Sequence, residues 1–538
     1  MNKKGLYFLI MASIFTSLIS CASTSTENVK DKILVSIDFD APKKTISPYI
    51  YGINDGANLN FVHPKSIRLG GNRMTAYNWE NNLSNAGSDW YHSSDDYMVQ
   101  RVRPEYKRVP GGAALNVSRD AFLRSIPYTL LTLQMAGYVA NSNGRMTKDN
   151  ALDGKDWCKV ENRKNAEFTL EPDKKDNVIY TDEYLNYLGQ KIGKSDSVTG
   201  FKAYALDNEP ALWNHTHPLI QREPLYAKDL IEKSVSLAST VKDFDPNAAV
   251  FGPSLFGYSA FVSLGADWTL IQSKSFYKYN WFIDFYLDQM QEAEKEYGKR
   301  LLDVLDIHYY TEAKGGCGKR KCNHYDNDEC IRARINSVRS LYDPNYKERS
   351  WIQDGGAKFF PLLQNLESSI DKFYPGTKLA FTEYDFGGGT DISGAIAQAD
   401  FLGLLAEHEV FFASIWAFDK ADYQFAAINM FTNYDDYDGY FGDRLISSTS
   451  SDDYVVSSFV AENDTDGKLH IILTNKEIHE CTEVTIDVSK YGCSEIEHYI
   501  LDKGGPDIYK SQETIKSKNG KIKIVLNPLT VNHLVISK

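Results

Sequence analysis

Two glutamates in this sequence each stand at the end of a short apolar run. Glu209 follows the run 201–206 in the segment YALDNEPALW, and Glu383 lies in the run 379–384 in the segment LAFTEYDFGGG. Two carboxyl groups in one cleft can divide acid–base work, because their surroundings can keep one protonated and the other ionised. Cleavage of a glycosidic bond needs that division: one carboxyl group protonates the leaving oxygen, and the other attacks or stabilises the anomeric carbon. The pair therefore predicts glycosidic cleavage, provided that the fold brings both side chains together.

Short apolar runs separated by longer amphipathic stretches extend over most of the chain. Eight runs can be counted, at 49–53, 66–69, 129–135, 201–206, 249–253, 304–310, 379–384 and 411–418. The intervening stretches 226–241, 282–297 and 392–408 carry apolar residues at helical spacing. Eight buried strands alternating with helices predict an α/β fold, a (β/α)8 TIM barrel, over residues 46–445. Active groups of such barrels sit at the carboxyl ends of the strands, and the fourth and seventh strands, which carry the two glutamates, can share one cleft.

The sequence pattern changes after about residue 445. Short strand-like stretches follow one another, separated by turn segments such as 463–467 and 518–520. Because no helical spacing interrupts them, residues 446–538 are predicted to form a small all-β sandwich. Residues 31–45 include an alternating stretch that reads as a half-buried strand, and we expect it to join this sandwich.

Several long segments resemble glycoside hydrolase family 44, and together they cover nearly the whole exported length of the chain. The most specific are SIRLGGNRMTAYNWENN at 66–82, SDWYHSSDDY at 88–97, YALDNEPALWNHTHP at 204–218 and YPGTKLAFTEYDFGGG at 374–389. The resemblance implies a barrel with an attached β-sandwich. It also implies a retaining endo-β-1,4-glucanase that acts on cellulose-type glucans, mixed-linkage glucan, xyloglucan or sometimes xylan. The run 315–330 departs from the family pattern, so the contacts of that loop are left open.

The same resemblance assigns roles to the two glutamates. It implies that Glu209 is the acid/base and that Glu383 is the nucleophile of a double-displacement reaction. It implies no cofactor for the chemistry, and it allows a structural calcium ion whose ligands the sequence does not indicate. We expect a monomer whose partner is a β-glucan polysaccharide.

Four polar residues are expected to support the pair. Asn208 precedes the acid and is placed to hydrogen-bond the sugar 2-hydroxyl. Arg68, at the end of the second run, could hold Glu383 ionised through a charge-assisted hydrogen bond, or form a structural ion pair under the barrel mouth. His308 and Tyr310 share one face of the sixth run with Asp306, because side chains alternate along a strand.

His308 and Tyr310 could therefore reach the nucleophile. The alternation does not settle whether Tyr309 or Tyr310 makes that contact.

Aromatic residues could bind the sugar rings, whose apolar faces gain from aromatic contact. Trp416, in the eighth run, resembles the platform under the sugar that is cleaved. Trp79 and Trp213, in loop segments, could stack on neighbouring sugars, and Tyr309 and Tyr384 are further candidates for substrate binding. For each of the three tryptophans the alternative is ordinary packing in the core.

The N-terminus reads as an export signal. Residues 1–20 contain two lysines followed by an apolar stretch, and the segment Leu18-Ile19-Ser20-Cys21 resembles the lipobox of a bacterial lipoprotein. We expect Cys21 to be acylated and residues 21–30 to form a polar tether. Because Ala22 replaces the Asp that commonly signals inner-membrane retention, we expect an extracytoplasmic protein anchored in the outer membrane or at the cell surface. An ordinary secretory signal is the alternative.

The other cysteines leave disulfide connectivity open. Six remain besides Cys21, and outside the cytoplasm disulfides are permitted. Cys481 and Cys493 flank a short strand-like stretch and could pair. Three further cysteines lie in the run 315–330, for which a disulfide-pinned surface loop is favoured over a zinc site.

Composition limits the rival functions. A net charge of −13 and the lack of a long basic run argue against nucleic acid as a partner. One rival is another barrel glycosidase, such as a xylanase or an arabinofuranosidase, and cleft shape would separate it from an enzyme that cuts chains internally. A second rival is a non-catalytic, surface glycan-binding lipoprotein, against which the presence of both glutamates argues.

Overall fold

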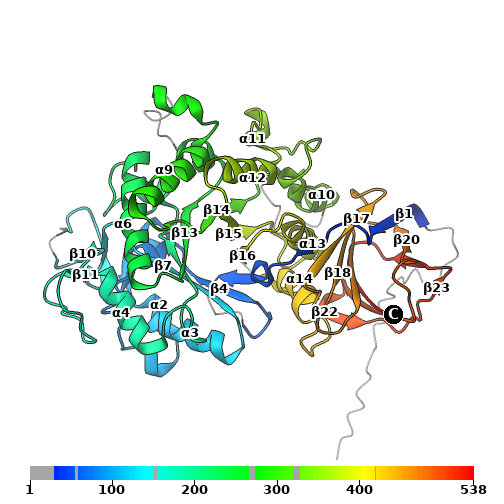
Figure 1. Cartoon of the computed structure of the whole chain (residues 1–538), viewed down its shortest axis with the longest axis horizontal. Coiled ribbons are helices and arrows are strands. Elements are labelled where there is room, and N and C mark those ends of the chain that lie inside the picture. Colours follow the sequence, from blue (N-terminus) through cyan, green and yellow to red (C-terminus); the bar gives the residue numbers. More distant parts are fainter. Residues whose placement is uncertain are drawn as a thin grey trace, which may run out of the picture.

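The structure is a computed structural model that describes residues 29–54, 59–150, 152, 154–265, 273–316, 318, 327–417 and 420–538. A helix-covered barrel forms most of it, and a sheet domain packs at one side of the barrel (Figure 1). The predicted signal peptide and Cys21 lie outside the described residues. Within the described ranges, none of the helices combines the length and the hydropathy that a membrane span requires.

Eight parallel strands close the barrel, which confirms the predicted (β/α)8 fold. In chain order they are β3 (Gly52–Asn54), β4 (Ser66–Leu69), β7 (Tyr128–Leu133), β12 (Ala203–Leu206), β13 (Ala249–Leu255), β14 (Val304–Tyr310), β15 (Lys378–Asp385) and β16 (Phe412–Ile415). Large and small side chains alternate inside and fill the barrel, as in the buried cluster Tyr128, Leu130, Ala203, Ala205, Phe251, Val304, Ala380 and Phe412. This packed lower layer leaves the carboxyl ends of the strands for polar side chains.

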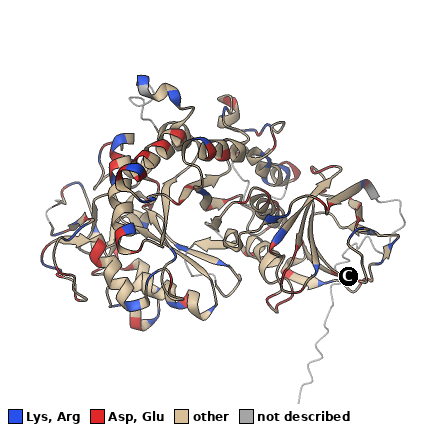
Figure 2. Ribbon diagram, viewed as in Figure 1, with Lys and Arg blue, Asp and Glu red and all other residues tan. Residues whose placement is uncertain are grey.

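Helices surround the barrel, each with its apolar face toward the strands. The longer ones are α3 (Gly112–Leu123), α4 (Thr181–Ile192), α6 (Ala227–Phe244), α7 (Tyr258–Ser263), α9 (Phe282–Tyr297), α10 (Asp328–Asn336), α12 (Leu362–Phe373), α13 (Ile392–Glu407) and α14 (Asp422–Thr432). In α12, for example, Leu362, Leu366 and Phe373 are buried at helical spacing. Charged residues of both signs lie along the outer helices (Figure 2).

Short elements extend the loops between the barrel strands. They include the helices α1 (Asn72–Thr75), α2 (Tyr97–Gln100), α5 (Trp213–Thr216) and α11 (Trp351–Asp354) and the strands β5 (Ser84–Asn85), β6 (Ser93–Asp95), β8 (Tyr138–Ala140), β9 (Gly144–Arg145), β10 (Trp157–Glu161) and β11 (Val178–Tyr180). Single 3-10 turns are η3 (Pro48–Ile50), η4 (Gly87–Trp90), η5 (Pro104–Tyr106), η6 (Pro210–Leu212), η7 (Lys274–Lys278) and η8 (Ser337–Leu341).

The second domain is one curled, mostly antiparallel sheet rather than two separate layers. Its strands are β1 (Val29–Asp38), β2 (Lys44–Thr45), β17 (Arg444–Ser450), β18 (Val456–Glu462), β19 (Leu469–Asn475), β20 (Cys481–Asp487), β21 (Glu495–Asp502), β22 (Gly505–Lys510), β23 (Ser517–Lys518), β24 (Lys521–Leu526) and β25 (Thr530–Ser537).

The sheet bends from one half to the other within strand β17. Its first residues pair with β18 and its last residues pair with β1, so one strand serves both halves. The curled sheet encloses its own apolar core, to which Val35, Val460, Leu473 and Ile524 belong. As expected from the sequence, the strand near the N-terminus, β1, pairs within this domain.

Helix α13 is the main contact between the two domains. Every residue from Ile392 to Ala406 is buried, because the barrel covers one side of the helix and the sheet covers the other. Asp400 of α13 forms a buried ion pair of 2.6 Å with Lys476, and it accepts a hydrogen bond of 2.6 Å from Thr474. The junction is therefore packed and specific in its polar contacts.

Candidate active site

Glu209 lies just beyond the end of β12, where the chain enters η6. Its backbone is left-handed, with φ 44° and ψ 55°, a conformation that is uncommon for residues other than glycine and that clusters at functional sites. The amide of Glu209 donates to the carbonyl oxygen of Ser254 on β13 at 3.1 Å. This contact fixes the backbone of Glu209 against the neighbouring strand.

Asp207 secures the segment that leads to Glu209. Its carboxyl group is fully buried and accepts hydrogen bonds from the Thr75 hydroxyl at 2.6 Å and from the amides of Met135 and Ala136 at 2.5 and 3.0 Å. Burial raises the pKa of Asp207 to about 6, although these hydrogen bonds oppose the rise. The end of β12 is thus tied to the loops that follow β4 and β7.

Glu383 points into the barrel because β15 is irregular at this position. Phe381 and Tyr384 both pack on Phe401 of α13, with ring centroids 5.6 and 4.5 Å away, so both face outward. Strict alternation after Phe381 would turn Glu383 outward as well. The register to β14 shifts by one residue between Phe381 and Glu383, which places Thr382 and Glu383 together on the inner side.

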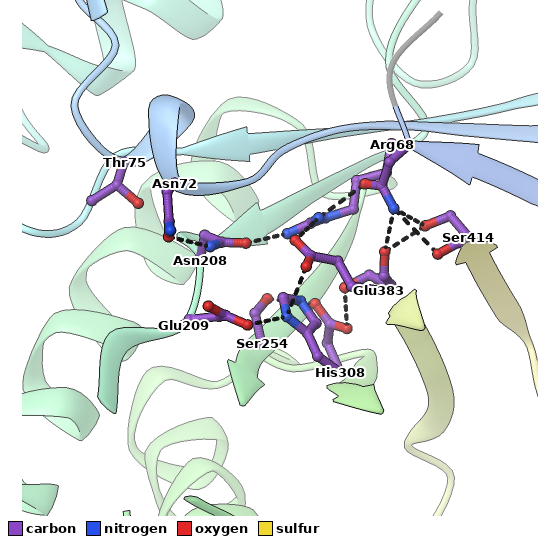
Figure 3. A network of polar contacts seen from close by, with 12 residues as sticks. Arg68, Asn72, Thr75, Asn208, Glu209, Ser254, His308, Glu383 and Ser414 are labelled. Atoms are coloured by element: carbon purple, nitrogen blue, oxygen red, sulfur yellow. Dashed lines mark hydrogen bonds and ion pairs between the residues drawn. The ribbon is translucent and has the colours of Figure 1, made fainter. Parts of the chain in front are cut away.

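The two glutamates meet at His308, on the inner face of β14. His308 Nδ1 lies 2.9 Å from Glu209 Oε1 and 3.5 Å from Glu383 Oε2. One carboxyl oxygen of each glutamate and a ring nitrogen of His308 all lie within 4.8 Å of one another. Figure 3 shows both glutamates directed toward His308, Glu209 from the β12 side and Glu383 from β15. The fold thus brings the predicted pair together.

Arg68 joins the two glutamate-bearing segments from the opposite side. From the end of β4 its guanidinium donates to Glu383 Oε1 at 2.7 Å, to Asn208 Oδ1 at 2.7 Å and to Asn54 Oδ1 at 2.9 Å (Figure 3). The Arg68 side chain is fully buried and that of Glu383 is 7% exposed, so the ion pair is shielded from water. Of the two readings considered for Arg68, the direct contact with Glu383 is the one that the geometry shows.

Burial and neighbouring charges move the two carboxyl pKa values in opposite directions. Burial raises the pKa of Glu209, and the contact with His308 offsets only part of that rise. Burial alone would also raise the pKa of Glu383, but His308, Arg68 and the hydroxyl of Tyr310 outweigh it and hold the pKa below its ordinary value. The two pKa values are therefore moved apart, upward for Glu209 and downward for Glu383, which is the direction that an acid beside an ionised carboxylate requires.

Tyr310 and Trp416 complete the surroundings of Glu383. Tyr310 donates from its hydroxyl to Glu383 Oε2 at 2.8 Å, so it is Tyr310 rather than Tyr309 that reaches the carboxylate. Trp416 follows the end of β16, is partly exposed, and lies so close to Gly71 that a β-carbon there would meet its ring. Trp416 thus borders the same barrel mouth.

Four aromatic residues proposed from the sequence for substrate binding lie in the core instead. Trp79 is 0% exposed and stacks on Tyr184 with ring centroids 5.0 Å apart. Trp213 is also 0% exposed, and its indole N–H donates to the carbonyl oxygen of Asn208 at 2.8 Å. These contacts correct the expectation that the two tryptophans stack on sugars.

The two tyrosines proposed with them are corrected on the same grounds. Tyr309 is 5% exposed on the outer face of β14 and lies near Phe386, with ring centroids 6.0 Å apart. Tyr384 is 0% exposed on the outer face of β15, where its hydroxyl accepts a hydrogen bond from Gln398 of α13 at 2.7 Å. A sugar in the barrel mouth cannot reach either ring.

Two asparagines that were not predicted from the sequence also belong to the site. Asn72 accepts a hydrogen bond of 3.0 Å from the side-chain amide of Asn208, which sets the orientation of Asn208. Asn54 accepts from Arg68 and donates to the carbonyl oxygen of Thr382 at 2.8 Å. Asparagine is common in loops, and only the position of Asn54 at the end of the first barrel strand could have suggested its role.

The structure also bears on the metal site and the disulfide that the sequence left open. Glu209, His308 and Glu383 form the only group of three such side chains close enough to hold a metal ion among the described residues. Those atoms already contact one another, and Arg68 compensates the charge of Glu383. Cys481 is disulfide-bonded and Cys493 is not, so the suggested Cys481–Cys493 pairing is wrong.

Comparison with known proteins places this geometry in a family. The model of glycoside hydrolase family 44 matches residues 83–313. Endoglucanase A of Paenibacillus lautus is 38% identical over 544 residues, which cover 99% of this chain and 77% of that protein. The β-mannanase/endoglucanase A of Caldicellulosiruptor saccharolyticus is 41% identical over 498 residues, which cover 88% of this chain but only 37% of that longer protein.

A solved structure agrees with the sequence relatives. The family 44 xyloglucanase of Paenibacillus polymyxa, solved with xyloglucan, superimposes with a TM-score of 0.90 at 40% identity. The match covers 94% of this chain and 100% of that chain. With this coverage at both the sequence and the structural level, the chain belongs to glycoside hydrolase family 44.

Proposed function

We propose that this protein is a retaining endo-β-1,4-glucanase with Glu209 as acid/base and Glu383 as nucleophile. The observation that carries the proposal is the short distance between the two carboxyl groups. One oxygen of Glu209 lies within 4.8 Å of one oxygen of Glu383, and a ring nitrogen of His308 lies within the same distance of both. Retaining glycosidases hold their carboxyl groups about 5–5.5 Å apart, whereas inverting enzymes leave roughly 6.5–9.5 Å for a water molecule. The opposite pKa shifts of Glu209 and Glu383 support the same assignment.

In the first step, ionised Glu383 attacks the anomeric carbon as the glycosidic bond breaks. Protonated Glu209 gives its proton to the departing oxygen, so the leaving chain departs as a neutral alcohol. Arg68 and Tyr310 position the attacking carboxylate through its two oxygens. Asn208, held by Arg68 and Asn72, is placed for the sugar 2-hydroxyl, where hydrogen bonding strengthens in the transition state.

In the second step, Glu209 is ionised and accepts a proton from an attacking water molecule. The new carbon–oxygen bond forms as the bond to Glu383 breaks, so both carboxyl groups return to their starting states. Two inversions at the same carbon leave the product in the β configuration. Tyr310 and Arg68 stabilise the Glu383 carboxylate as it is released.

The substrate proposal rests on the relatives. One is an endoglucanase by name, and another is a xyloglucanase solved with xyloglucan. We propose cellulose-type glucans, mixed-linkage glucan or xyloglucan as substrates, cut within the chain. A panel of carboxymethyl cellulose, mixed-linkage glucan, xyloglucan, xylan and mannan tests this, with reducing ends and product sizes measured together.

Internal cutting predicts a rapid fall in the viscosity of carboxymethyl cellulose with few new reducing ends. Glu383→Gln and Glu209→Gln are the controls, and both should lose activity on every polysaccharide. Activity on xylan or mannan alone, or on none of the five, would contradict the glucanase proposal. Release of only short products from chain ends would contradict internal cleavage.

We also propose that Cys21 anchors the protein to a membrane outside the cytoplasm, at the outer membrane or the cell surface. The support is the lipobox-like segment and the polar residues after it. Cys21→Ala should release the protein from the membrane fraction with unchanged specific activity. Membrane retention of that variant would refute the anchor. We propose that the released protein is a monomer, which sedimentation of Cys21→Ala would test.

A further inference from the structure

The strands on both sides of β14 each contain one extra residue, and the two positions lie within one residue of each other along β14. Between β13 and β14 the register passes from Pro253 opposite Asp306 to Leu255 opposite Ile307, which leaves Ser254 as the extra residue. Between β14 and β15 the extra residue is Thr382, as described above. Extra residues of this kind bend a strand locally and redirect its side chains, and they recur next to active sites.

Asp306 lies between these two irregular positions and binds both. Its carboxylate accepts a hydrogen bond from the Ser254 hydroxyl at 2.5 Å and from the Thr382 hydroxyl at 2.6 Å. The Asp306 side chain is 0% exposed, as are Ser254 and Thr382. Each oxygen of the Asp306 carboxyl group thus accepts one hydrogen bond, Oδ2 from Ser254 and Oδ1 from Thr382.

Each of the two hydroxyl-bearing residues holds one catalytic glutamate. The carbonyl oxygen of Ser254 accepts the amide of Glu209 at 3.1 Å, and its backbone is itself left-handed, with φ 53°. Thr382 immediately precedes Glu383, and its carbonyl oxygen accepts hydrogen bonds from Asn54 at 2.8 Å and from Ser414 at 2.6 Å. The path from Glu209 to Glu383 through Asp306 therefore consists of three hydrogen bonds and one peptide link.

We propose that Asp306 is a positioning residue that sets the separation of the two catalytic carboxyl groups by holding Ser254 and Thr382 in place. The inference rests on the proposed function, because it concerns the same two glutamates. Within the described structure, the Asp306 side chain hydrogen-bonds to Ser254 and Thr382 and not to either glutamate. It acts through the backbones that carry them, and misplacement of a reacting group by about 1 Å can cost 10²-fold in rate.

Variants that remove only one of the two hydrogen bonds to Asp306 separate this role from general stability. Thr382→Val keeps the shape of the side chain and removes only the hydroxyl that faces Asp306, and Ser254→Ala removes the other hydroxyl. Thr132→Val is the matched control, since Thr132 is a buried barrel threonine on β7 whose hydroxyl has no hydrogen-bond partner within the described structure. Asp306→Asn and Asp306→Ala test the carboxylate itself.

The expected result is a loss of kcat with little change in KM. Rates are expressed per active site, counted by covalent trapping with an activated 2-deoxy-2-fluoro-cellobioside, so that a misfolded fraction does not lower them. We expect Thr382→Val and Asp306→Ala to lose about 10²-fold in kcat, and Thr132→Val to match the wild type. Asp306→Asn should retain most of the activity, because an amide and two rotatable hydroxyls can still bridge the gap.

The leaving group of the substrate distinguishes the effect of losing the Ser254 hydroxyl from that of losing the Thr382 hydroxyl. Ser254 acts through Glu209, so the kcat/KM of Ser254→Ala should recover on aryl glycosides whose leaving groups need little protonation. Thr382 acts through Glu383, so the loss in Thr382→Val should persist on those substrates. A change in stability alone would not produce this difference.

The inference is overturned if Thr382→Val and Ser254→Ala both keep the wild-type kcat per active site, whether or not Asp306→Ala folds. It is also overturned if the losses do not depend on the leaving group as stated. Failure of the proposed function shows itself differently, because Glu383→Gln would then remain active. The two outcomes can therefore be told apart in the same set of assays.

Discussion

Removal of the charge on Arg68 should shift the acidic side of the pH–rate profile. Arg68 donates to Glu383 at 2.7 Å inside the barrel, where both side chains are shielded from water. An arginine this close lowers a carboxyl pKa by about 1–3 units, and each unit corresponds to about 1.4 kcal/mol. Arg68→Met removes one of the groups that hold the pKa of Glu383 down, so it should raise that pKa.

The direction of the expected shift follows from the nucleophilic role proposed for Glu383. A nucleophile must be ionised, so activity is lost as the pH falls through the pKa of Glu383, which lies below its ordinary value in the wild type. A raised pKa moves this acidic limb of kcat/KM to higher pH. The basic limb reports Glu209, whose pKa is raised, and it should move less because Arg68 makes no hydrogen bond to Glu209.

Arg68→Lys is the matched control. Lysine keeps the positive charge but cannot bridge Glu383 and Asn208 with a planar fork. We expect its acidic limb to stay near the wild-type position while kcat falls through the loss of Asn208 orientation. The assay is kcat/KM for a soluble aryl cellobioside across the acidic and neutral range, with thermal melting at each pH to confirm folding. An acidic limb of Arg68→Met that coincides with the wild type would refute the reasoning.

Three further results are expected. His308→Gln should move both limbs of the profile to higher pH, because His308 lowers the pKa of both glutamates, and a shift to lower pH would contradict the contacts of His308. Trp416→Ala should reduce kcat on soluble glucan, whereas Trp79→Ala should leave the kinetics of the folded protein unchanged and cost about 3–5 kcal/mol in denaturant unfolding. The reverse pattern would place Trp79 in the cleft. Lys476→Met should cost about 3–5 kcal/mol in the same unfolding assay, since it leaves Asp400 charged and buried at the domain junction, and a neutral effect would mean that the ion pair does not stabilise the fold.

The barrel could be predicted because its signal is distributed over the whole chain. Eight apolar runs and the helical spacing between them survive errors of a few residues at each boundary. The local geometry at Glu383 could not be predicted in that way. Alternation along the run 379–384 places Phe381 and Glu383 on one face, and only the extra residue Thr382 separates them.

Residue type alone also could not show whether a tryptophan stacks on a sugar or packs in the core. Trp79 and Trp213 stand in the segments that most resemble the family, yet their partners are Tyr184 and the carbonyl oxygen of Asn208. The burial of Trp79 depends on a helix about a hundred residues further along the chain. The curled sheet likewise depends on contacts between distant segments. Its short strands could be recognised in the sequence, but the strand β17, which both halves of the sheet share, could not.

Proton NMR of the first product released from a β-linked glucan oligosaccharide tests the retaining mechanism most directly. The anomeric signal is read before the product equilibrates with the other anomer. With Glu383 as nucleophile and Glu209 as acid/base, the new reducing end should appear first as the β anomer, with the α anomer growing in only by mutarotation. An initial α anomer would show a single displacement by water and would contradict the roles given to both glutamates.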